Sequence, residues 1–388
     1  MSRIDFFGQM NTLAAELGAI NLGHGYADDP PLSMMVDAAT MAMAGGENQY
    51  SPSAGQQTLR AELARRLAAR GLAYDPDDEI TVTAGCTEAL AAAALAHAPP
   101  GSEVLTLEPF YDSYPLLAQL AGAKLVSVPV RGLGGGDASG ATHEPDLPAL
   151  RASISPATRV LLLNSPHNPT GLCLSRPAAE AVATLAIEND LVVLSDEVYE
   201  ELVYDGDHVP VATLDGMRGR TIVCSSVTKT LSVSGWRVGW ACAPAHLMEP
   251  LRTVHQGLSY CAPTPLQQGA AVALRWGDDS GYFDQLRADY RARRDLLVDG
   301  LRSAGLDVSP PPAGYFVVAD VSPWSDGADV EAFALRLAHE AGVVALPLSP
   351  FVSCAAMADH MMRFAFCKAP GVLREAGQRL ERFANSRA

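Results

Sequence analysis

Short apolar runs rich in β-branched residues alternate with longer helical patterns between about residue 79 and residue 242. Strands are expected at 80–83, 104–107, 124–130, 159–164, 191–196 and 221–225. Because such alternation is typical of strands joined by crossover helices, the predicted fold class is α/β, with a mainly parallel sheet covered by helices. Ligands of such sheets bind beyond the carboxyl ends of the strands, where several polar motifs of this chain lie.

The pattern changes after this region toward a second, smaller unit. Leu, Ala and Tyr at helical spacing over 265–305 predict one long helix that links two bodies. A strand is then expected at 314–320, a helix at 330–341, a strand at 361–366 and a helix at 372–385. These elements predict a compact α+β domain at the C-terminal end.

Composition limits the classes of protein to which the chain can belong. It has 388 residues, 48% of them hydrophobic, which is enough to bury one large core and a smaller one. A formal net charge of -16 disfavours nucleic-acid binding. The seven cysteines match no metal-site spacing and are expected to be reduced thiols. Without a signal-like start or an apolar span of ~20 residues, we expect a cytoplasmic protein that does not bind membranes.

Lys229 lies in a stretch of hydroxyl and glycine residues, three residues after Ser226 and eight before Arg237. A lysine that forms a Schiff base must be desolvated and held in position. A phosphate needs hydroxyl donors and a guanidinium fork close by. The stretch therefore predicts a site for a phosphorylated aldehyde, against the simpler alternative of a lysine in an ordinary loop.

Three further motifs follow predicted strands. Asp196 ends the apolar run at 191–196, and Asn168 lies in 164–171, where prolines fix the backbone. Gly85 begins a turn from a strand into an Ala-rich helix, so the backbone N–H groups of 85–87 can hold an anion. Each motif also has a simpler explanation: Asp196 as a helix N-cap, Asn168 in a plain Asn-Pro turn, and Gly85 in a turn without a ligand.

Arg363 alternates with apolar neighbours in the predicted strand at 361–366. An unpaired arginine is costly to bury, so this position predicts a bound anion. The alternative is a partly exposed strand residue.

Together these motifs resemble the class I/II pyridoxal-phosphate-dependent aminotransferases of the aspartate aminotransferase fold type I superfamily. They follow the family's order from Asn21 to Phe366, and the stretches 83–90, 254–256 and 262–265 are most similar to the kynurenine and methionine aminotransferase branch. The resemblance implies a mainly parallel, seven-stranded-type central sheet. It also implies a large cofactor-binding domain at 36–284, a small α+β domain at 285–388, and an N-terminal segment at 1–35 that joins the small domain and closes the site.

The resemblance also implies how the cofactor, pyridoxal 5′-phosphate, is held. The catalytic residues would be Lys229 as the Schiff-base lysine, Asp196 as the partner of the pyridinium nitrogen, and Tyr199. Tyr199 and Asn168 would donate to the phenolate oxygen, and Tyr111 would stack on the ring. The phosphate would be bound by Gly85, Cys86, Thr87, Ser226, Arg237 and, from the neighbouring subunit, Tyr50. A homodimer with shared active sites is therefore expected.

The implied reaction moves the amino group of an L-amino acid to a 2-oxo acid through pyridoxamine 5′-phosphate, with apolar, sulfur-containing or aromatic side chains favoured. Arg363 would grip the substrate α-carboxylate. The other substrate-binding residues would be Asn168, Gly25, Tyr26 and Phe110. Two positions depart from the family, and their side chains have no assigned role: His24 stands where many relatives have Gln, and Cys86, whose backbone could still bind the phosphate, stands where they have a small Ala or Ser.

Two other functions use the same residues. A lyase, decarboxylase or oxidative deaminase on this scaffold would differ only in which substrate bond is aligned and where the proton returns. A DNA-associated regulator would need an added DNA-binding module, for which we expect no room because the first motif begins at about residue 21.

Overall fold

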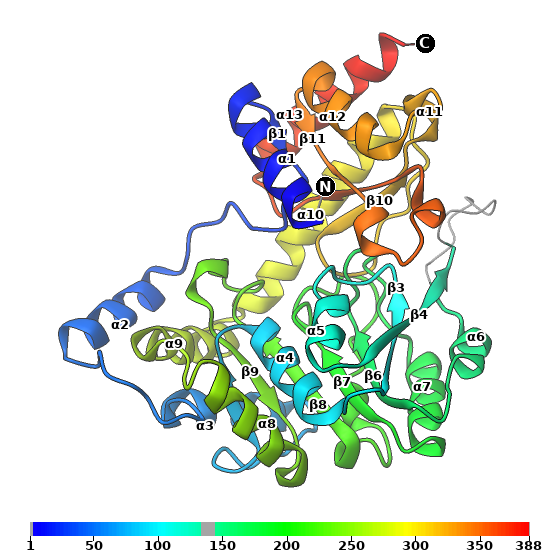
Figure 1. Ribbon diagram of the computed structural model, residues 1–388. Coiled ribbons are helices and arrows are strands. Elements are labelled where there is room, and N and C mark those ends of the chain that lie inside the picture. Colours follow the sequence, from blue (N-terminus) through cyan, green and yellow to red (C-terminus); the bar gives the residue numbers. More distant parts are fainter. Residues whose placement is uncertain (1–2, 133–143, 388) are drawn as a thin grey trace.

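The computed structural model describes residues 3–132 and 144–387. Figure 1 shows a large body built on a central sheet and a smaller body at the C-terminal end, joined by a long helix. Within the described ranges, no helix is both long enough and apolar enough to cross a membrane.

The described residues of the large body form an eight-stranded sheet in the order β2-β9-β8-β7-β6-β3-β4-β5. The strands are β2 (Ile80–Thr83), β3 (Glu103–Glu108), β4 (Lys124–Arg131), β5 (Glu144–Pro145), β6 (Thr158–Asn164), β7 (Val192–Asp196), β8 (Thr221–Ser226) and β9 (Gly239–Cys242). The pairs among β4, β3, β6, β7 and β8 are parallel, whereas β9 runs antiparallel to both β2 and β8. All six expected strands are confirmed. The described sheet has the seven main strands that the resemblance implies and, in addition, the two-residue edge strand β5.

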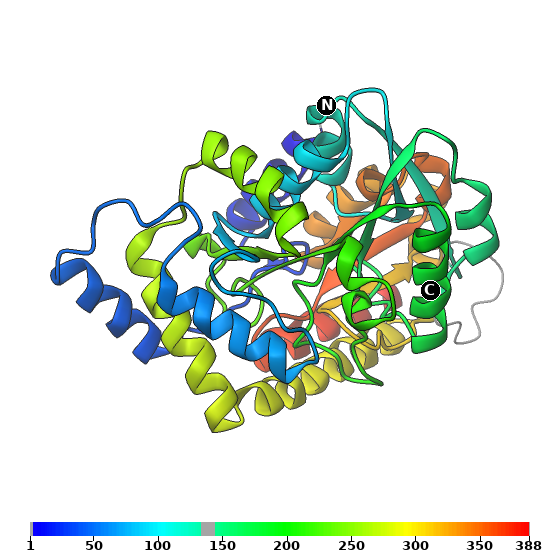
Figure 2. The ribbon, with the colours of Figure 1, turned by 90° about the horizontal axis from the view of Figure 1, so that it is seen from below.

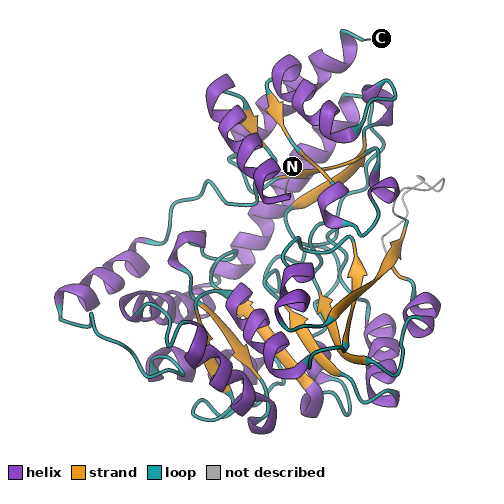
Figure 3. Cartoon of the chain, in the orientation of Figure 1, coloured by secondary structure: helices purple, strands orange, loops and turns teal. Residues whose placement is uncertain are grey.

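Helices cover both faces of this sheet, as Figure 3 shows. The sheet interior is apolar on both sides because alternate residues of β6 join different cores: Leu162 packs with the helices of one face and Leu163 with those of the other. The helices are α2 (Ser33–Ala44), α3 (Gln57–Ala69), α4 (Cys86–His97), α5 (Tyr114–Leu120), α6 (Leu147–Ala152), α7 (Arg176–Glu188) and α8 (Ala245–Leu258). Short 3-10 turns lie at Val211–Thr213, Arg218–Arg220, Ser234–Trp236, Ser349–Phe351 and Ala355–Ala358.

The single long helix expected at 265–305 is wrong, because two helices occupy this range. α9 (Thr264–Ser280) ends at Gly281, and α10 (Tyr282–Ser303) begins directly after it. Gly281 has a φ of +74°, in the left-handed region that glycine adopts without a steric penalty. A left-handed residue cannot continue a right-handed helix, so the axis changes direction there. α10 links the two bodies, and the chain between β1 (Ile20–Asn21) and α2 connects them a second time (Figure 1 and Figure 2).

The small body contains a three-stranded sheet in the order β10-β13-β12. Its elements are β10 (Phe316–Asp320), α11 (Ser322–Ser325), α12 (Val330–Ala341), β11 (Val343–Val344), β12 (Leu346–Pro347), β13 (Met361–Ala365) and α13 (Pro370–Asn385). The N-terminal segment, with α1 (Arg3–Leu17) and β1 (Ile20–Asn21), joins it because β1 pairs in parallel with β11. The domain bounds 1–35, 36–284 and 285–388 stay a prediction.

Candidate active site

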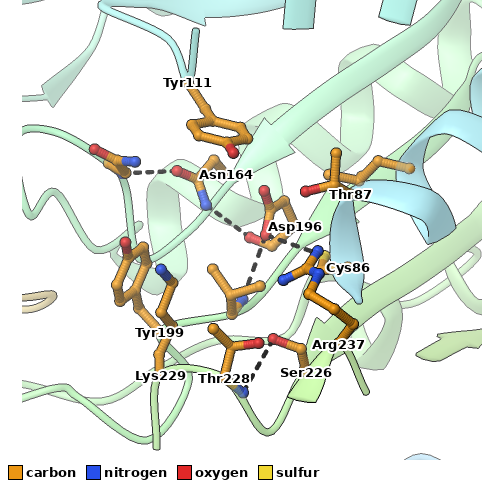
Figure 4. A pocket seen from close by; sticks show the side chains of 13 residues that line it. Cys86, Thr87, Tyr111, Asn164, Asp196, Tyr199, Ser226, Thr228, Lys229 and Arg237 are labelled. Atoms are coloured by element: carbon orange, nitrogen blue, oxygen red, sulfur yellow. Dashed lines mark hydrogen bonds between the residues drawn. The ribbon is translucent and has the colours of Figure 1, made fainter. Parts of the chain in front are cut away.

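The carboxyl ends of the parallel strands open into one cavity of the large body. Asn164 ends β6, Asp196 ends β7 and Ser226 ends β8. Because these strands are parallel neighbours, their last side chains meet at one edge of the sheet. The cavity lining, most of it labelled in Figure 4, comprises Cys86, Thr87, Leu90, Tyr111, Asn164, Asn168, Asp196, Val198, Tyr199, Ser226, Thr228, Lys229 and Arg237.

Lys229 lies on the turn after β8, and its amine points into this cavity (Figure 4). Nζ lies 6.0 Å from the ring centre of Tyr199 and 5.5 Å from that of Tyr315. Burial lowers the pKa of Lys229 to about 8, since desolvation disfavours the charged amine. This amine is therefore closer to its neutral, nucleophilic form than an ordinary lysine is.

Asp196 is buried at 4% exposure, and both its carboxylate oxygens are bonded. The Tyr114 hydroxyl donates to Oδ2 over 2.7 Å, while the Cys86 thiol and the Val198 N–H donate to Oδ1 over 3.7 and 3.4 Å. No helix follows Asp196, so its bond to Val198 closes a turn and the helix-cap alternative is wrong. Burial raises the pKa of Asp196 to about 6, and the bond from Tyr114 opposes this rise.

The turn before α4 is shaped for an anion. Gly85 has a φ of +85°, and a Cβ at this position would overlap the Arg237 guanidinium. Arg237 itself has a φ of +52°, an uncommon conformation for a residue other than glycine. Its Nη2 donates to the Ala84 carbonyl over 3.4 Å, which holds the guanidinium at the start of the helix. Cys86 and Thr87 bring the free N–H groups of the first turn to the same place.

Asn168 and Arg363 connect this cavity to a second one. Arg363 donates to Asn168 Oδ1 over 3.0 Å and to the Gly23 carbonyl over 3.1 Å. Its side chain lies against the rings of Phe316 and Phe351, at 4.0 and 4.5 Å. Nε of Arg363 is buried and has no partner among the described residues. Because Asn168 Oδ1 accepts from Arg363, the amide NH2 of Asn168 is oriented to donate elsewhere.

The second cavity, which we call the side-chain chamber, has a volume of about 310 Å³ and adjoins Lys229. Its wall away from the first cavity combines aromatic and apolar side chains with polar and charged ones. The residues that line this part are Phe7, Gly23, His24, Gly25, Asp112, Phe316, Leu346, Phe351 and Arg363. A Cβ at Gly25 would overlap the rings of Tyr315 and Phe316, so only glycine fits there.

Four sequence-predicted residues do not line either cavity, and one of them is Gly85, which lies behind the lining in the turn before α4. Phe110 is 2% exposed and packs in the core beside α4 and α5, so its predicted place in the substrate pocket is wrong. Successive side chains point in different directions, and Tyr111 takes the cavity side instead. Tyr26 is half exposed and stacks on Lys368 at 4.0 Å. Tyr50 is 80% exposed, with its ring 5.2 Å from that of Tyr260.

Several site residues had no clear signal in the sequence. Tyr114 lies in the same 108–114 stretch as Tyr111, but nothing in that stretch indicates that its hydroxyl reaches Asp196. Phe7, Phe316 and Phe351 come from three distant segments, and only tertiary packing brings them together at the side-chain chamber.

The donor set suits pyridoxal 5′-phosphate. It combines a lysine amine of lowered pKa, a buried carboxylate, oriented amide and phenol groups, and an anion cup in which only Gly85 leaves room for Arg237. Among the described residues, no group of His, Cys, Asp and Glu side chains is arranged to hold a metal ion.

Comparison with known proteins agrees with this geometry. The family model for aminotransferase class I and II matches residues 18–380. A probable N-succinyldiaminopimelate aminotransferase of Mycobacterium tuberculosis is 44% identical over 384 residues, covering 96% of this chain and 94% of that protein. Kynurenine–oxoglutarate transaminase 1 of Homo sapiens is 34% identical over 395 residues, covering 96% and 94%.

The crystal structure of YbdL from Escherichia coli, with an identified methionine aminotransferase function, matches with a TM-score of 0.91 and 34% identity. It covers 97% of this chain and 96% of that one. These proteins are all named for amino transfer, which favours transamination over the lyase, decarboxylase and deaminase alternatives. The chain belongs to the class I and II aminotransferases, and it is an enzyme that uses pyridoxal 5′-phosphate to transfer an amino group between amino acids and 2-oxo acids.

Proposed function

We propose that Lys229, Asp196 and Tyr199 are the catalytic residues of this aminotransferase. The observation that carries the proposal is that Lys229 Nζ opens into the same cavity as the Asp196 carboxylate, with its pKa lowered to about 8. A lysine that acts as nucleophile and base needs a pKa near the working pH. Burial raises the pKa of Tyr199, so its hydroxyl stays protonated and can donate.

Pyridoxal 5′-phosphate, when bound, supplies an aldehyde that condenses with amines and a pyridine ring that withdraws electrons from the substrate. Asp196 would hold the proton on the ring nitrogen, because a buried carboxylate stabilises a cation beside it. Asn168 and Tyr199 would donate to the phenolate oxygen, and Tyr111 would lie against the ring. The phosphate would be held by Gly85, Cys86, Thr87, Ser226 and Arg237.

Arg363 would bind the substrate α-carboxylate in the side-chain chamber. Its terminal nitrogens donate to Asn168 and Gly23, which fixes the orientation of the guanidinium, and its buried Nε has no partner among the described residues. A guanidinium held in one orientation can bind a carboxylate through two parallel hydrogen bonds. Lys229 Nζ, which lines both cavities, would then take a proton from the substrate α-carbon and return it on the cofactor side.

The amino acids that fit this site are those with apolar, sulfur-containing or aromatic side chains. The aromatic wall formed by Phe7, Phe316 and Phe351 supports this substrate class, because it offers apolar area and ring edges. No arginine other than Arg363 lines the described part of the chamber, so we expect no binding site for a second substrate carboxylate.

The working enzyme would be a homodimer in which Tyr50 reaches the cofactor phosphate of the other subunit. Its high exposure within one chain supports this, as does its ring contact with Tyr260, a second exposed aromatic residue. We also place the enzyme in the cytoplasm, because its seven cysteines are all unpaired.

Replacing Lys229 tests the catalytic assignment. Lys229→Ala is expected to keep non-covalent affinity for the cofactor, to lose borohydride-stable labelling, and to lose essentially all transamination of an L-amino acid with a 2-oxo acid acceptor. Lys124→Ala, at a lysine whose side chain is 75% exposed, is the matched control and should behave as wild type. Undiminished turnover by Lys229→Ala would refute the assignment.

A further inference from the structure

A buried histidine that the proposed mechanism does not use is connected to the anion cup. His255, in α8, is completely buried, and both of its ring nitrogens contact acceptor atoms. Nδ1 lies 2.7 Å from Glu88 Oε1, and Nε2 lies 2.9 Å from the Ser53 carbonyl oxygen. Ser53 belongs to the loop that carries Tyr50, so this one ring joins α8, α4 and that loop.

Glu88 is the link between His255 and the cup. It lies in the first turn of α4, and its Oε2 accepts the backbone N–H of Ala84, the residue before Gly85. This bond closes the turn whose free N–H groups form the cup. Oε1 accepts from the Ser259 hydroxyl over 2.6 Å as well as from His255. Burial raises the pKa of Glu88, but these hydrogen bonds outweigh it and the pKa is lowered, so Glu88 is a carboxylate at neutral pH.

The partners of His255 determine how many protons its ring carries. A carbonyl oxygen only accepts hydrogen bonds, so Nε2 must carry a proton to bond Ser53. A carboxylate also only accepts, so Nδ1 must carry a proton to bond Glu88. With a proton on each nitrogen the ring is an imidazolium, whose charge balances that of Glu88. The two side chains therefore form an ion pair without net charge, largely shielded from solvent.

An unbalanced carboxylate at position 88 would oppose phosphate binding. A phosphate ester carries a charge of about −1.5 to −2 at neutral pH, and the positive end of the helix dipole attracts it to the start of α4. A negative charge in the first turn of the same helix cancels part of this attraction. Pairing with His255 removes that effect, while Glu88 keeps its hydrogen bond to the turn.

We propose that His255 is a positioning residue for the cofactor: as an imidazolium it neutralises Glu88, so that this carboxylate can close the cup without repelling the phosphate. The inference rests on the proposed function, because the turn at 85–87 must be where the phosphate binds. His255 lines neither cavity, so it acts through Glu88.

Comparing pyridoxal 5′-phosphate with pyridoxal tests the inference, because the two ligands differ only in the phosphate. Absorbance measures the affinity of the apoprotein for each ligand. In His255→Gln the Glu88 charge is unbalanced, and the loss of affinity for pyridoxal 5′-phosphate is expected to exceed the loss for pyridoxal by about tenfold or more. In the double variant His255→Gln with Glu88→Gln, neither charge is present and most of this difference should disappear. A purely structural role would leave the double variant at least as weak as the single one.

His97→Gln is the matched control. His97 lies in the last turn of α4 and also joins this helix to α8, but its partner, the Leu247 carbonyl at 2.9 Å, carries no charge. This variant should leave the ratio of the two affinities unchanged. Equal losses for both ligands in His255→Gln, or a double variant that recovers nothing, would overturn the inference. A wild-type apoprotein that binds the two ligands equally well would instead contradict the proposed phosphate site.

A spectroscopic measurement tests the imidazolium without any ligand. In apoprotein with ¹⁵N-labelled histidine rings, the signal that disappears in His255→Gln should show protons on both ring nitrogens at about pH 7. A bare Nδ1 or a bare Nε2 at this pH would show that the ring does not balance the charge of Glu88, and the inference would fail.

Discussion

The lowered pKa of Lys229 makes the reactivity of a single amine measurable without any substrate. In the apoprotein, modification of Lys229 by an amine-reactive reagent is expected to rise with pH and to reach half its limit near pH 8, because the amine is neutral only above its pKa of about 8. For an ordinary lysine, the midpoint of the modification lies at about pH 10.4. Mass spectrometry of the modified peptides gives the profile, with the exposed Lys124 as the internal reference. A midpoint for Lys229 well above 9 would contradict its burial.

Tyr114 holds Asp196 from outside the cavity, and its hydroxyl should influence how the carboxylate ionises. The pKa of Asp196, about 6, lies above the ordinary carboxyl value, so the carboxylate is lost as the pH falls through about 6. Tyr114→Phe removes a bond that favours the charged form, and is expected to move this loss upward by about one to two pH units. The shift is measured from the dissociation constant of the cofactor, determined for the wild-type and Tyr114→Phe apoproteins at several pH values between about 5 and about 8.5.

The control for Tyr114→Phe is Tyr290→Phe. Tyr290 is also fully buried, but its hydroxyl has no partner among the described residues, so removing it leaves Asp196 unchanged. If both variants give the same profile as the wild type, the Tyr114 hydroxyl does not support the carboxylate.

At the level of elements, the break between α9 and α10 depends on one backbone conformation. Gly281→Ala adds a methyl group with no atom within 4 Å, so its cost comes from the φ of +74° alone. We expect the free energy of unfolding to fall by about 1–2 kcal/mol. Gly8→Ala, in the interior of α1 and also without a neighbour within 4 Å, should raise it by about 0.5–1 kcal/mol. Urea unfolding measures the free energy of unfolding of both variants. Equal changes in the two variants would contradict the left-handed conformation of Gly281.

The elements also show where sequence patterns succeed and where they do not. The parallel strands were predicted because they are buried on both faces and read as continuous apolar runs. β9 is as short as β2, but its sequence Gly-Trp-Ala-Cys lacks the β-branched residues of Ile-Thr-Val-Thr, so it is defined only by its pairing with β2 and β8. The break at Gly281 was missed because apolar residues keep helical spacing on both sides of it, and one glycine does not reveal its φ.

At the scale of the whole molecule, the predicted site residues fall into two groups. Those at strand ends, such as Asp196 and Ser226, come together because a parallel sheet places all its carboxyl ends at one edge. The chamber wall could not be predicted in the same way, because Phe7, Phe316 and Phe351 are adjacent only after the two bodies and the N-terminal segment pack. Phe110 shows the same limit: whether an aromatic residue at a strand end faces a core or a cavity is decided by packing.

The last prediction concerns the dimer and uses hybrids of two variants, one with weakened cofactor binding and one without the Schiff-base lysine. Tyr50→Phe should weaken cofactor binding by about tenfold or more, because a bond to a charged group is worth about 1.5–3 kcal/mol. If Tyr50 acts on the other subunit, mixing Tyr50→Phe with Lys229→Ala chains creates hybrid dimers with one intact site, since the Lys229→Ala chain donates its Tyr50 to the intact lysine. About a quarter of all sites should then regain wild-type cofactor affinity and turnover after subunit exchange. If Tyr50 serves its own chain, mixing restores nothing, and the shared site is disproved.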